Sequence, residues 1–203
     1  MPVYCQTLGK AQQGEYQEKG SRFIAYAFPC TDSAFFTAYL NDIKEHHLKA
    51  RHHCYAWRLG EYGQDWRVND DGEPSGSAGL PIYNQMLSYQ LSDTGVIVVR
   101  YFGGKLLGIP GLIRAYKTAT QNALAAAEII AIVPKMRITV KLEYAQIYFL
   151  MQIVAQFSLT ICEQTLAMHC RYQLELNRDD YEAVAAALNA AGITIATNEI
   201  ETS

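Results

Sequence analysis

Three carboxylates and a serine-glycine run stand close together between Asp70 and Pro81, in the segment DDGEPSGSAGLP. Such carboxylates suit a divalent metal or a general base, because magnesium is commonly held by one or two carboxylates and a substrate phosphate. They equally suit a tight turn, or an arginine clamp on Arg51 or Arg100. All three interpretations stay open. We predict that the segment forms the rim of a binding cleft, with rim residues Asp70, Asp71, Glu73, Ser75 and Ser77.

The run SGSAG, from Ser75 to Gly79, offers backbone amides without large side chains. Consecutive amides of this kind form nests that bind anions. The run matches neither the phosphate loop, which needs Gly-Lys-Ser/Thr, nor the nucleophile elbow, which needs a glycine two residues before the serine. The serines are therefore interpreted as turn formers, with a nucleophilic serine as the alternative.

A second candidate is RYFGGKLLGIPG, from Arg100 to Gly111. A strand, paired glycines and a helix start resemble the layout in which a helix amino terminus meets phosphate. No Asp or Glu occurs from Thr94 to Ala127, and Tyr116 adds a further ring for stacking on bases. The alternative is that the aromatic residues belong to the core and the glycines permit close packing. We predict an anion- or nucleic-acid-binding surface made by Arg100, Tyr101, Gly103, Gly104, Lys105, Gly108, Arg114 and Lys117.

The run RHHC, from Arg51 to Cys54, adds Arg51, His52 and His53 to the predicted cleft rim. On a strand, His52 and Cys54 share one face and His53 points to the other, so one metal ion cannot easily take all three. A hydrogen-bonded histidine beside the acidic segment is expected. A histidine acid or base paired with Asp71 or Glu73 is the alternative. We predict no metal and no cofactor.

Alternating and helical apolar patterns define the elements that carry these residues in the first half of the chain. Between the second strand and the second helix, a long polar stretch runs from Glu61 to Gly79. The predicted strands are Ser21 to Cys30, His52 to Gly60 and Gly95 to Gly104. The predicted helices span Phe35 to Ile43, start at Pro81, and span Leu112 to Ile130.

Pro134 marks a boundary, and we predict domains at residues 1–133 and 134–203. The second half has the order β-α-β-β-α-β, the split-βαβ arrangement of ferredoxin-like domains. It shows no charged constellation, and its exposed sheet face meets either a partner or the first half. Its predicted strands are Arg137 to Leu142, Leu159 to Leu166, Cys170 to Asn177 and Ile193 to Glu199. Its helices are Ala145 to Phe157 and Asp179 to Gly192.

Composition predicts a packed protein, because half of the 203 residues are apolar and 18% are charged. The net charge of −3 argues against a dedicated nucleic-acid binder but leaves room for one basic face. The apolar runs are too short to span a membrane, and Met1 to Gly20 has no apolar signal-peptide core. We therefore expect a cytoplasmic protein without membrane contact. Five cysteines without a Cys-x-x-Cys pair indicate reduced thiols.

Three stretches resemble the signatures of the YigZ/IMPACT family: ARHHCYAWRLG at Ala50 to Gly60, VNDDGEPSGSAGLP at Val68 to Pro81, and VVRYFGGKLLGIPGLIRAY at Val98 to Tyr116. The arginine-aromatic-aromatic-Gly-Gly pattern followed by Leu-Gly is specific. With the order of the two domains, the resemblance covers nearly the whole chain.

The resemblance implies an α+β protein of two domains. The first would be similar to the second domain of a small-subunit ribosomal protein and to domain IV of elongation factor G, and the second would be ferredoxin-like. Eukaryotic relatives regulate translation under amino-acid starvation through a partner of the general-control kinase. They carry a further partner-binding domain, for which this chain is too short. No catalytic residues come with the family.

We therefore expect a non-catalytic cytoplasmic protein that binds RNA or the ribosome and modulates translation under stress. One alternative is an enzyme that acts on a nucleotide or another phosphorylated small molecule. The other is a protein-interaction module with a translation-related partner. The oligomeric state is not predicted.

Overall fold

The structure is a computed structural model that describes residues 6–60, 62–166 and 170–199. Cys5, one of the five cysteines, and Glu61, the first residue of the long polar stretch, lie outside these residues. The fold is α+β, as predicted, with three antiparallel sheets. The chain divides into two compact units, Met1–Ile132 and Val133–Thr202, each with its own core. Among the described residues, no helix is long and apolar enough to cross a membrane.

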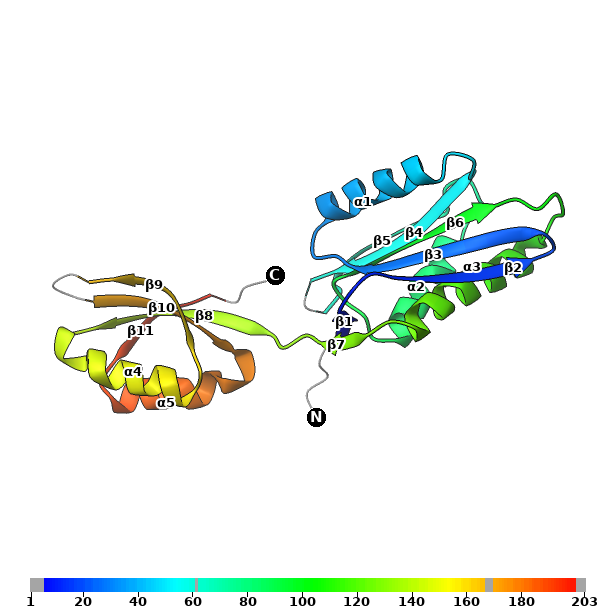
Figure 1. The fold of residues 1–203 in the computed structure, drawn as a ribbon. Helices are drawn as coiled ribbons and strands as arrows, with labels where there is room; N and C mark the ends of the chain where they lie inside the picture. Colours follow the sequence, from blue (N-terminus) through cyan, green and yellow to red (C-terminus); the bar gives the residue numbers. More distant parts are fainter. Residues whose placement is uncertain (1–5, 61, 167–169, 200–203) are drawn as a thin grey trace. The chain divides into compact units, whose positions relative to one another are not determined.

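The first unit is built on a five-stranded antiparallel sheet with the strand order β2-β3-β6-β4-β5 (Figure 1). Helix α1 (Ser33–His46) covers one face, and α2 (Gly79–Ser88) and α3 (Gly108–Ala125) cover the other. Strands β1 and β7 form a separate pair. The strand bounds are β1 Gln6–Leu8, β2 Gln12–Glu18, β3 Ser21–Pro29, β4 His52–Leu59, β5 Asp65–Asn69, β6 Thr94–Tyr101 and β7 Ile129–Ala131.

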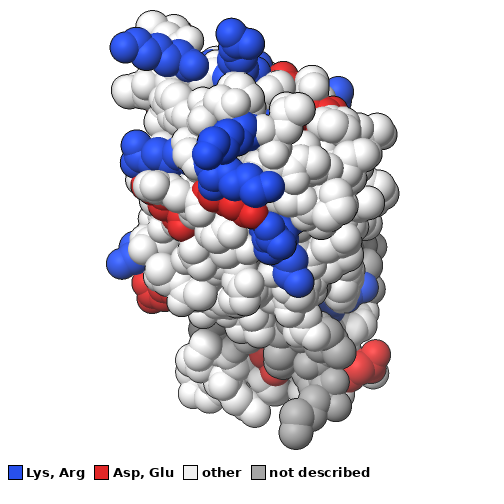
Figure 2. Space-filling model, turned by 90° about the vertical axis from the view of Figure 1, so that its right-hand side faces the viewer, with Lys and Arg blue, Asp and Glu red and all other residues white. Residues whose placement is uncertain are grey.

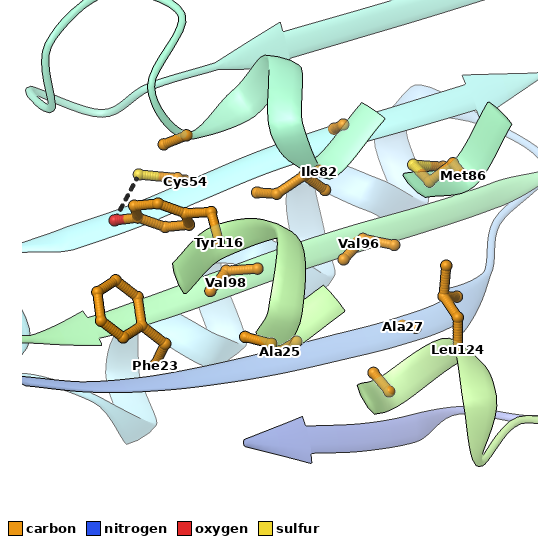
Figure 3. Packing of buried hydrophobic residues seen from close by; sticks show 14 of the residues in the cluster. Phe23, Ala25, Ala27, Cys54, Ile82, Met86, Val96, Val98, Tyr116 and Leu124 are labelled. Atoms are coloured by element: carbon orange, nitrogen blue, oxygen red, sulfur yellow. Dashed lines mark hydrogen bonds between the residues drawn. The ribbon is translucent and has the colours of Figure 1, made fainter. Parts of the chain in front are cut away.

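Strand β6 is the centre of this unit because helices cover both of its faces. Val96 and Val98 belong to the core under α2 and α3, whereas Ile97 and Val99 belong to the core under α1. All four side chains are fully buried. A continuous β-branched run fits such a position, since each face of the strand needs apolar side chains. Figure 3 shows the packing under α2 and α3.

The strand register brings the acidic segment after Asn69 and the RYFGGKLLGIPG stretch from Arg100 to one end of the sheet. His52 pairs with Arg100, Arg22 pairs with Tyr101, and Tyr55 pairs with Asn69. Four connections therefore meet there, and we call this region the loop end. It consists of the β2–β3 turn (Lys19–Gly20), the α1–β4 loop (His47–Arg51), the β5–α2 loop (Asp70–Ala78) and the β6–α3 loop (Phe102–Leu107).

The second unit has the order β-α-β-β-α-β, with the strands arranged as β11-β8-β10-β9. Both helices cover one face of this sheet (Figure 1). Short 3-10 turns, Tyr144–Gln146 and Arg178–Asp180, precede the two helices. The element bounds are β8 Lys135–Leu142, α4 Ile147–Gln156, β9 Thr160–Thr165, β10 Cys170–Asn177, α5 Tyr181–Ala190 and β11 Thr194–Glu199.

The sheet register of the second unit gathers charges that the sequence analysis did not recognise. Lys141 and Arg171 are exposed and directly opposed on β8 and β10. Lys135 and Arg137 lie on the same face, and both contact Glu175. The prediction of no charged constellation in this half was therefore wrong. The alternation KxRxTxK in β8 carried the signal, because residues two apart share a face.

Elements of the first unit depart from the predictions at the sheet edges. The edge strands β2 and β5 were missed, because exposed edge strands carry polar residues and look like loops. Helix α2 begins at Gly79 and not at Pro81. Helix α3 begins at Gly108 and ends at Ala125, and Ile129–Ala131 is a strand instead of its last turn.

Strand β2 crosses α3 at Gly14, where only a hydrogen fits. A Cβ at this position would lie 2.1 Å from the backbone nitrogen of Ala123. We predict that Gly14→Ala lowers the free energy of unfolding by about 1–3 kcal/mol or more, because the backbone of α3 must move. The measurement is urea denaturation followed by tryptophan fluorescence, which reports the first unit because both tryptophans, Trp57 and Trp66, lie there.

Gly9→Ala is the matched control, since the nearest atom to its Cβ is the flexible Glu128 side chain at 3.3 Å. Equal losses in the two variants would contradict the tight crossing of β2 and α3.

Candidate functional site

A buried ion pair lies beneath the loop end. The Nη1 atom of Arg100, at the end of β6, donates to Oε1 of Glu73 in the β5–α2 loop at 2.6 Å, and the two side chains are 6% and 4% exposed. The Tyr116 hydroxyl on α3 donates to the same oxygen at 2.8 Å. One carboxylate thus joins β6, α3 and the β5–α2 loop. Of the interpretations left open for the acidic segment, the arginine clamp is therefore the one that describes Glu73, and Arg100 is its partner.

The Arg100 guanidinium is enclosed by aromatic rings as well. Its carbon lies 5.5 Å from the ring centroids of both Phe23 and Phe102. A guanidinium held this way gains from the ring quadrupoles and from the carboxylate, which together offset part of its desolvation. The structure therefore does not present Arg100 to solvent, where the predicted anion-binding surface needed it. Its positive charge is compensated inside the protein by Glu73.

Cys54 and Tyr116 extend this buried network. The Cys54 thiol donates to the Asp70 carbonyl at 3.0 Å and lies 3.2 Å from the Tyr116 hydroxyl, a contact drawn in Figure 3. Burial raises the pKa of both groups, so both are neutral at pH 7. Tyr116 also packs edge-on against Phe23, at 5.1 Å between centroids. It is a core residue and not the solvent-facing ring that base stacking requires.

Asp70 fills the predicted anion nest. Its Oδ1 accepts from the backbone nitrogens of Ala78 and Gly79 at 3.0 and 2.9 Å, and its Oδ2 accepts from Gly76 at 2.8 Å. The carboxylate also lies at the amino terminus of α2, where a negative charge is favourable. Three of the SGSAG amides are therefore satisfied by the protein's own anion, and the Ser77 amide donates to the Pro74 carbonyl. Ser77 is buried and donates to the Pro74 carbonyl at 2.6 Å, whereas Ser75 is exposed.

Asp71 joins the acidic segment to the histidines of β4. Its Oδ2 accepts from the backbone nitrogen of His53 at 2.6 Å, and its carbonyl accepts from Nδ1 of His52 at 2.8 Å. The structure thus has the hydrogen-bonded histidine expected beside this segment. Burial lowers the pKa of His53, and the nearby Asp71 carboxylate opposes that effect. Among the described residues, no group of three His, Cys, Asp or Glu is arranged to hold a metal ion.

Arg114 is exposed on α3, but its charge is also engaged. Its Nη2 contacts Oε1 of Glu18 at the end of β2, and its Nε lies 3.4 Å from Oε2. This contact lowers the pKa of Glu18. Nothing in the sequence pattern pointed to Glu18, which lies 96 residues from Arg114. Arg114 therefore contributes less positive field than its sequence neighbourhood predicted.

The predicted glycines shape the β6–α3 loop. A Cβ on Gly103 would lie 1.9 Å from the carbonyl carbon of Gly20, so this loop touches the β2–β3 turn through backbone alone. Gly104 and Gly108 have positive φ, and Gly108 begins α3, whose amino terminus has no side-chain cap. Tyr101 faces the opposite side of the sheet from Arg100 and bonds His47 Nδ1 at 2.7 Å.

Four exposed cations remain at the loop end after these pairs are set aside, and a fifth, Lys117, is exposed on α3. No ion pair involves any of them within the part of the chain that the structure describes, whereas Glu18, Asp70, Asp71 and Glu73 are all hydrogen-bonded. Glu45, in the last turn of α1, is an exposed acid nearby. Figure 2 views the molecule from the side of the loop end, where Lys and Arg predominate. The five cations are Lys19, Lys49, Arg51, Lys105 and Lys117.

The comparisons with known proteins show the family of this chain. The model of the Impact N-terminal domain matches residues 19–124, a span that contains the whole loop end. The chain belongs to the IMPACT family. This confirms the resemblance drawn from the three sequence stretches.

Several IMPACT family members are similar over much of this chain. A Haemophilus influenzae IMPACT family member is 32% identical over 176 residues, 86% of this chain and 85% of that protein. The IMPACT family member YigZ of Escherichia coli is 35% identical over 131 residues, 64% of each chain. The crystal structure of a hypothetical protein superposes with a TM-score of 0.75 and 25% identity, covering 99% of this chain and all of that one.

The buried pair and an exposed pair predict different losses of stability. Glu73→Gln leaves the Arg100 charge buried and uncompensated, which costs about 3–5 kcal/mol of unfolding free energy. Glu15→Gln breaks the exposed pair with Arg22, and the loss is expected to be much smaller because solvent screens that pair. Urea denaturation at pH 7 with tryptophan detection measures both. Similar values for the two variants would remove Arg100–Glu73 from its central position.

His53 predicts a pH dependence of the first unit. Because burial lowers its folded-state pKa, the unfolded chain binds a proton below about pH 6.5 while the folded chain does not. Stability is therefore complete above pH 6.5 and falls as the pH drops toward the folded-state pKa. His47 shifts in the same direction, and the exposed His46 in the opposite one.

We expect His53→Gln to lose less stability than the unmodified protein between pH 7.5 and 5.5, as measured by urea denaturation at both values. His46→Gln is the control on an exposed histidine. A pH dependence that His53→Gln leaves unchanged would assign the effect elsewhere.

Proposed function

We propose that this protein is a non-catalytic cytoplasmic RNA- or ribosome-binding protein that modulates translation, with the loop end as the surface that holds phosphates. The observation that carries the proposal is the set of five exposed cations, four at the loop end and Lys117 on α3, that form no ion pair within the described residues. Exposed lysines without carboxylate partners attract phosphates and release counterions, which is the main source of non-specific nucleic-acid affinity.

Lys105 on the β6–α3 loop and Lys117 on α3 are expected to contact phosphates. The uncapped amino terminus of α3 adds backbone donors between them. Lys19, Lys49 and Arg51 extend the surface to the neighbouring connections. Such contacts fix the position of a strand but carry no sequence information, so binding at this surface is expected to be insensitive to sequence.

The acidic segment does not oppose this function, because its carboxylates are engaged internally. Asp70 is bonded by three backbone amides, Asp71 by the His53 amide, and Glu73 by Arg100 and Tyr116. The charge of Glu73 is compensated by Arg100, whereas Asp70 and Asp71 keep their charges but bond to backbone amides and not to the exposed cations. The same engagement weighs against the enzyme alternative, since the side chains needed for a base or nucleophile are occupied in building the loop.

The fold supports the proposal by analogy. The second unit has the strand order and connections of a ferredoxin-like domain. The first unit, interpreted as similar to domain IV of elongation factor G, corresponds to a domain that works on the ribosome. Fold analogy alone does not define a function, so the charge pattern carries the main argument.

A translation-related protein partner is the second candidate. Leu106 is 84% exposed, and Phe102 and Ile109 are about half exposed, in and beside the β6–α3 loop. Exposed apolar side chains grouped this way mark contact sites more often than isolated ones do. A ribosomal surface offers both RNA and protein, and therefore suits both sets of side chains.

The test compares two double variants that each remove two positive charges. Lys105→Ala with Lys117→Ala is expected to weaken binding to single-stranded RNA and to lower the slope of log affinity against log salt by about 1.4, or 0.7 per phosphate contact. Lys10→Ala with Arg67→Ala, outside the loop end, is the matched control. Filter binding or fluorescence anisotropy across a salt series measures both. Equal affinities for the two double variants would reject the loop end as the binding surface.

A further inference from the structure

A polar hollow lies beside the loop end, on the α1 side of the sheet. Helix α1 packs over β4, β6 and the far end of β3, and leaves the flank of β2 and β3 uncovered. The hollow on this flank has a volume of about 330 Å³. Its main lining residues are Gln13, Glu15, Arg22, Tyr26, His47 and Tyr101. Tyr101 was predicted to contact nucleic acid. The other five residues were not among the predicted site residues.

A histidine bridged by two tyrosines forms one wall of the hollow. The Tyr26 hydroxyl lies 2.6 Å from Nε2 of His47, and the Tyr101 hydroxyl lies 2.7 Å from Nδ1. Burial lowers the pKa of His47, as do the neighbouring charges of His46 and Arg22. The ring is therefore neutral at pH 7, with one donor and one acceptor.

With a neutral histidine between two tyrosines, one of the two tyrosine O–H groups is not needed as a donor to the ring. One tyrosine donates to the bare ring nitrogen, and the other accepts the ring N–H and keeps its own proton. Because both tyrosines line the hollow, the wall offers a hydroxyl proton that the bridge does not use. Both rings also offer apolar faces of the kind on which bases stack.

The rest of the lining mixes donors with acceptors. The Gln13 amide has both, and Arg22 is half exposed while it holds the Glu15 carboxylate through two hydrogen bonds, at 2.8 and 2.7 Å. A carboxylate on the rim disfavours a free anion. Ile24 supplies an apolar surface, and Gly14 supplies no side chain. A flat ring with both donor and acceptor edges satisfies such a lining, and nucleobases are rings of this kind.

The hollow is continuous with the loop end along the chain. Tyr101 directly precedes Phe102 of the β6–α3 loop, and Arg22 follows the β2–β3 turn that carries Lys19. A strand whose phosphates lie on the loop end therefore passes next to the hollow. Recognition of single-stranded RNA typically combines these two elements, a basic surface for the backbone and a pocket for an unstacked base.

We propose that the hollow between β2, β3, β6 and the end of α1 binds a single nucleobase. For an RNA ligand, this inference rests on the function proposed above. With free nucleotides it stands by itself, because the hollow and the five cations consist of different residues.

The experiment titrates the four nucleoside 5′-monophosphates and ribose 5-phosphate into the full-length protein by isothermal calorimetry or NMR. At least one nucleotide is expected to bind at least ten times more tightly than ribose 5-phosphate, because the base supplies the contacts. Gln13→Ala is expected to weaken that nucleotide about five-fold, the usual effect of one hydrogen bond. Gln12→Ala is the matched control, since Gln12 is the adjacent glutamine and faces the α3 side of the same strand.

Tyr101→Phe provides an independent variant that keeps the ring and removes one hydroxyl from the histidine bridge. It is also expected to weaken the nucleotide several-fold and to change the NMR titration of His47. Equal binding of ribose 5-phosphate and every nucleotide would overturn the base pocket, as would equal effects of Gln13→Ala and Gln12→Ala.

The outcomes separate this inference from the proposed function. If RNA binding depends on Lys105 and Lys117 but nucleotides do not bind, the base pocket is overturned and the phosphate surface stands. If nucleotides bind with the expected dependence on Gln13 and RNA does not bind, the base pocket stands as a nucleotide site and the proposed function fails.

Discussion

The first unit depends on the buried pair of Arg100 and Glu73. It joins the last residues of the central strand to the acidic loop, and Tyr116 ties the same carboxylate to α3. Buried charges are expensive to desolvate, and a pair repays that cost only with good geometry and further hydrogen bonds. Here the geometry includes a second donor and two aromatic rings. The pair therefore fixes one arrangement of the loop end more than it adds net stability.

Once Glu73 is held in place, the rest of the acidic segment follows. Asp70 turns inward to cap α2 and to order the SGSAG run, and Asp71 adopts a positive φ and bonds the amide of His53. The carboxylates that suggested chemistry are thus the means by which a loop without regular structure keeps one conformation. Because these carboxylates bond within the first unit's own framework, none of them forms an ion pair with the exposed lysines among the described residues.

The sequence was sufficient for β10, whose side chains alternate between core and solvent, and for β3 and β6, whose apolar runs are buried on both faces. It was insufficient for β2 and β5, because edge strands need no apolar face. The burial of Tyr116 had a signal, since Leu112, Ala115, Ala119 and Ala123 mark one face of α3 and Tyr116 lies on it. The pairing of Arg114 with Glu18 could not be predicted, because no local sequence pattern relates residues on β2 and α3 that are so far apart in the chain.

The same limit explains why the recognisable motif and the proposed ligand contacts differ. Arg100, Glu73, the glycines and Tyr116 make the motif distinctive because a buried ion pair and backbone-only contacts tolerate few residue types. Lys19, Lys49 and Lys117 stand at exposed positions where many residues fit, so they have no signature of their own. His47, Tyr26 and Tyr101 meet only through the fold. A motif of this kind therefore identifies the platform, and the ligand is read from the side chains that the platform leaves exposed.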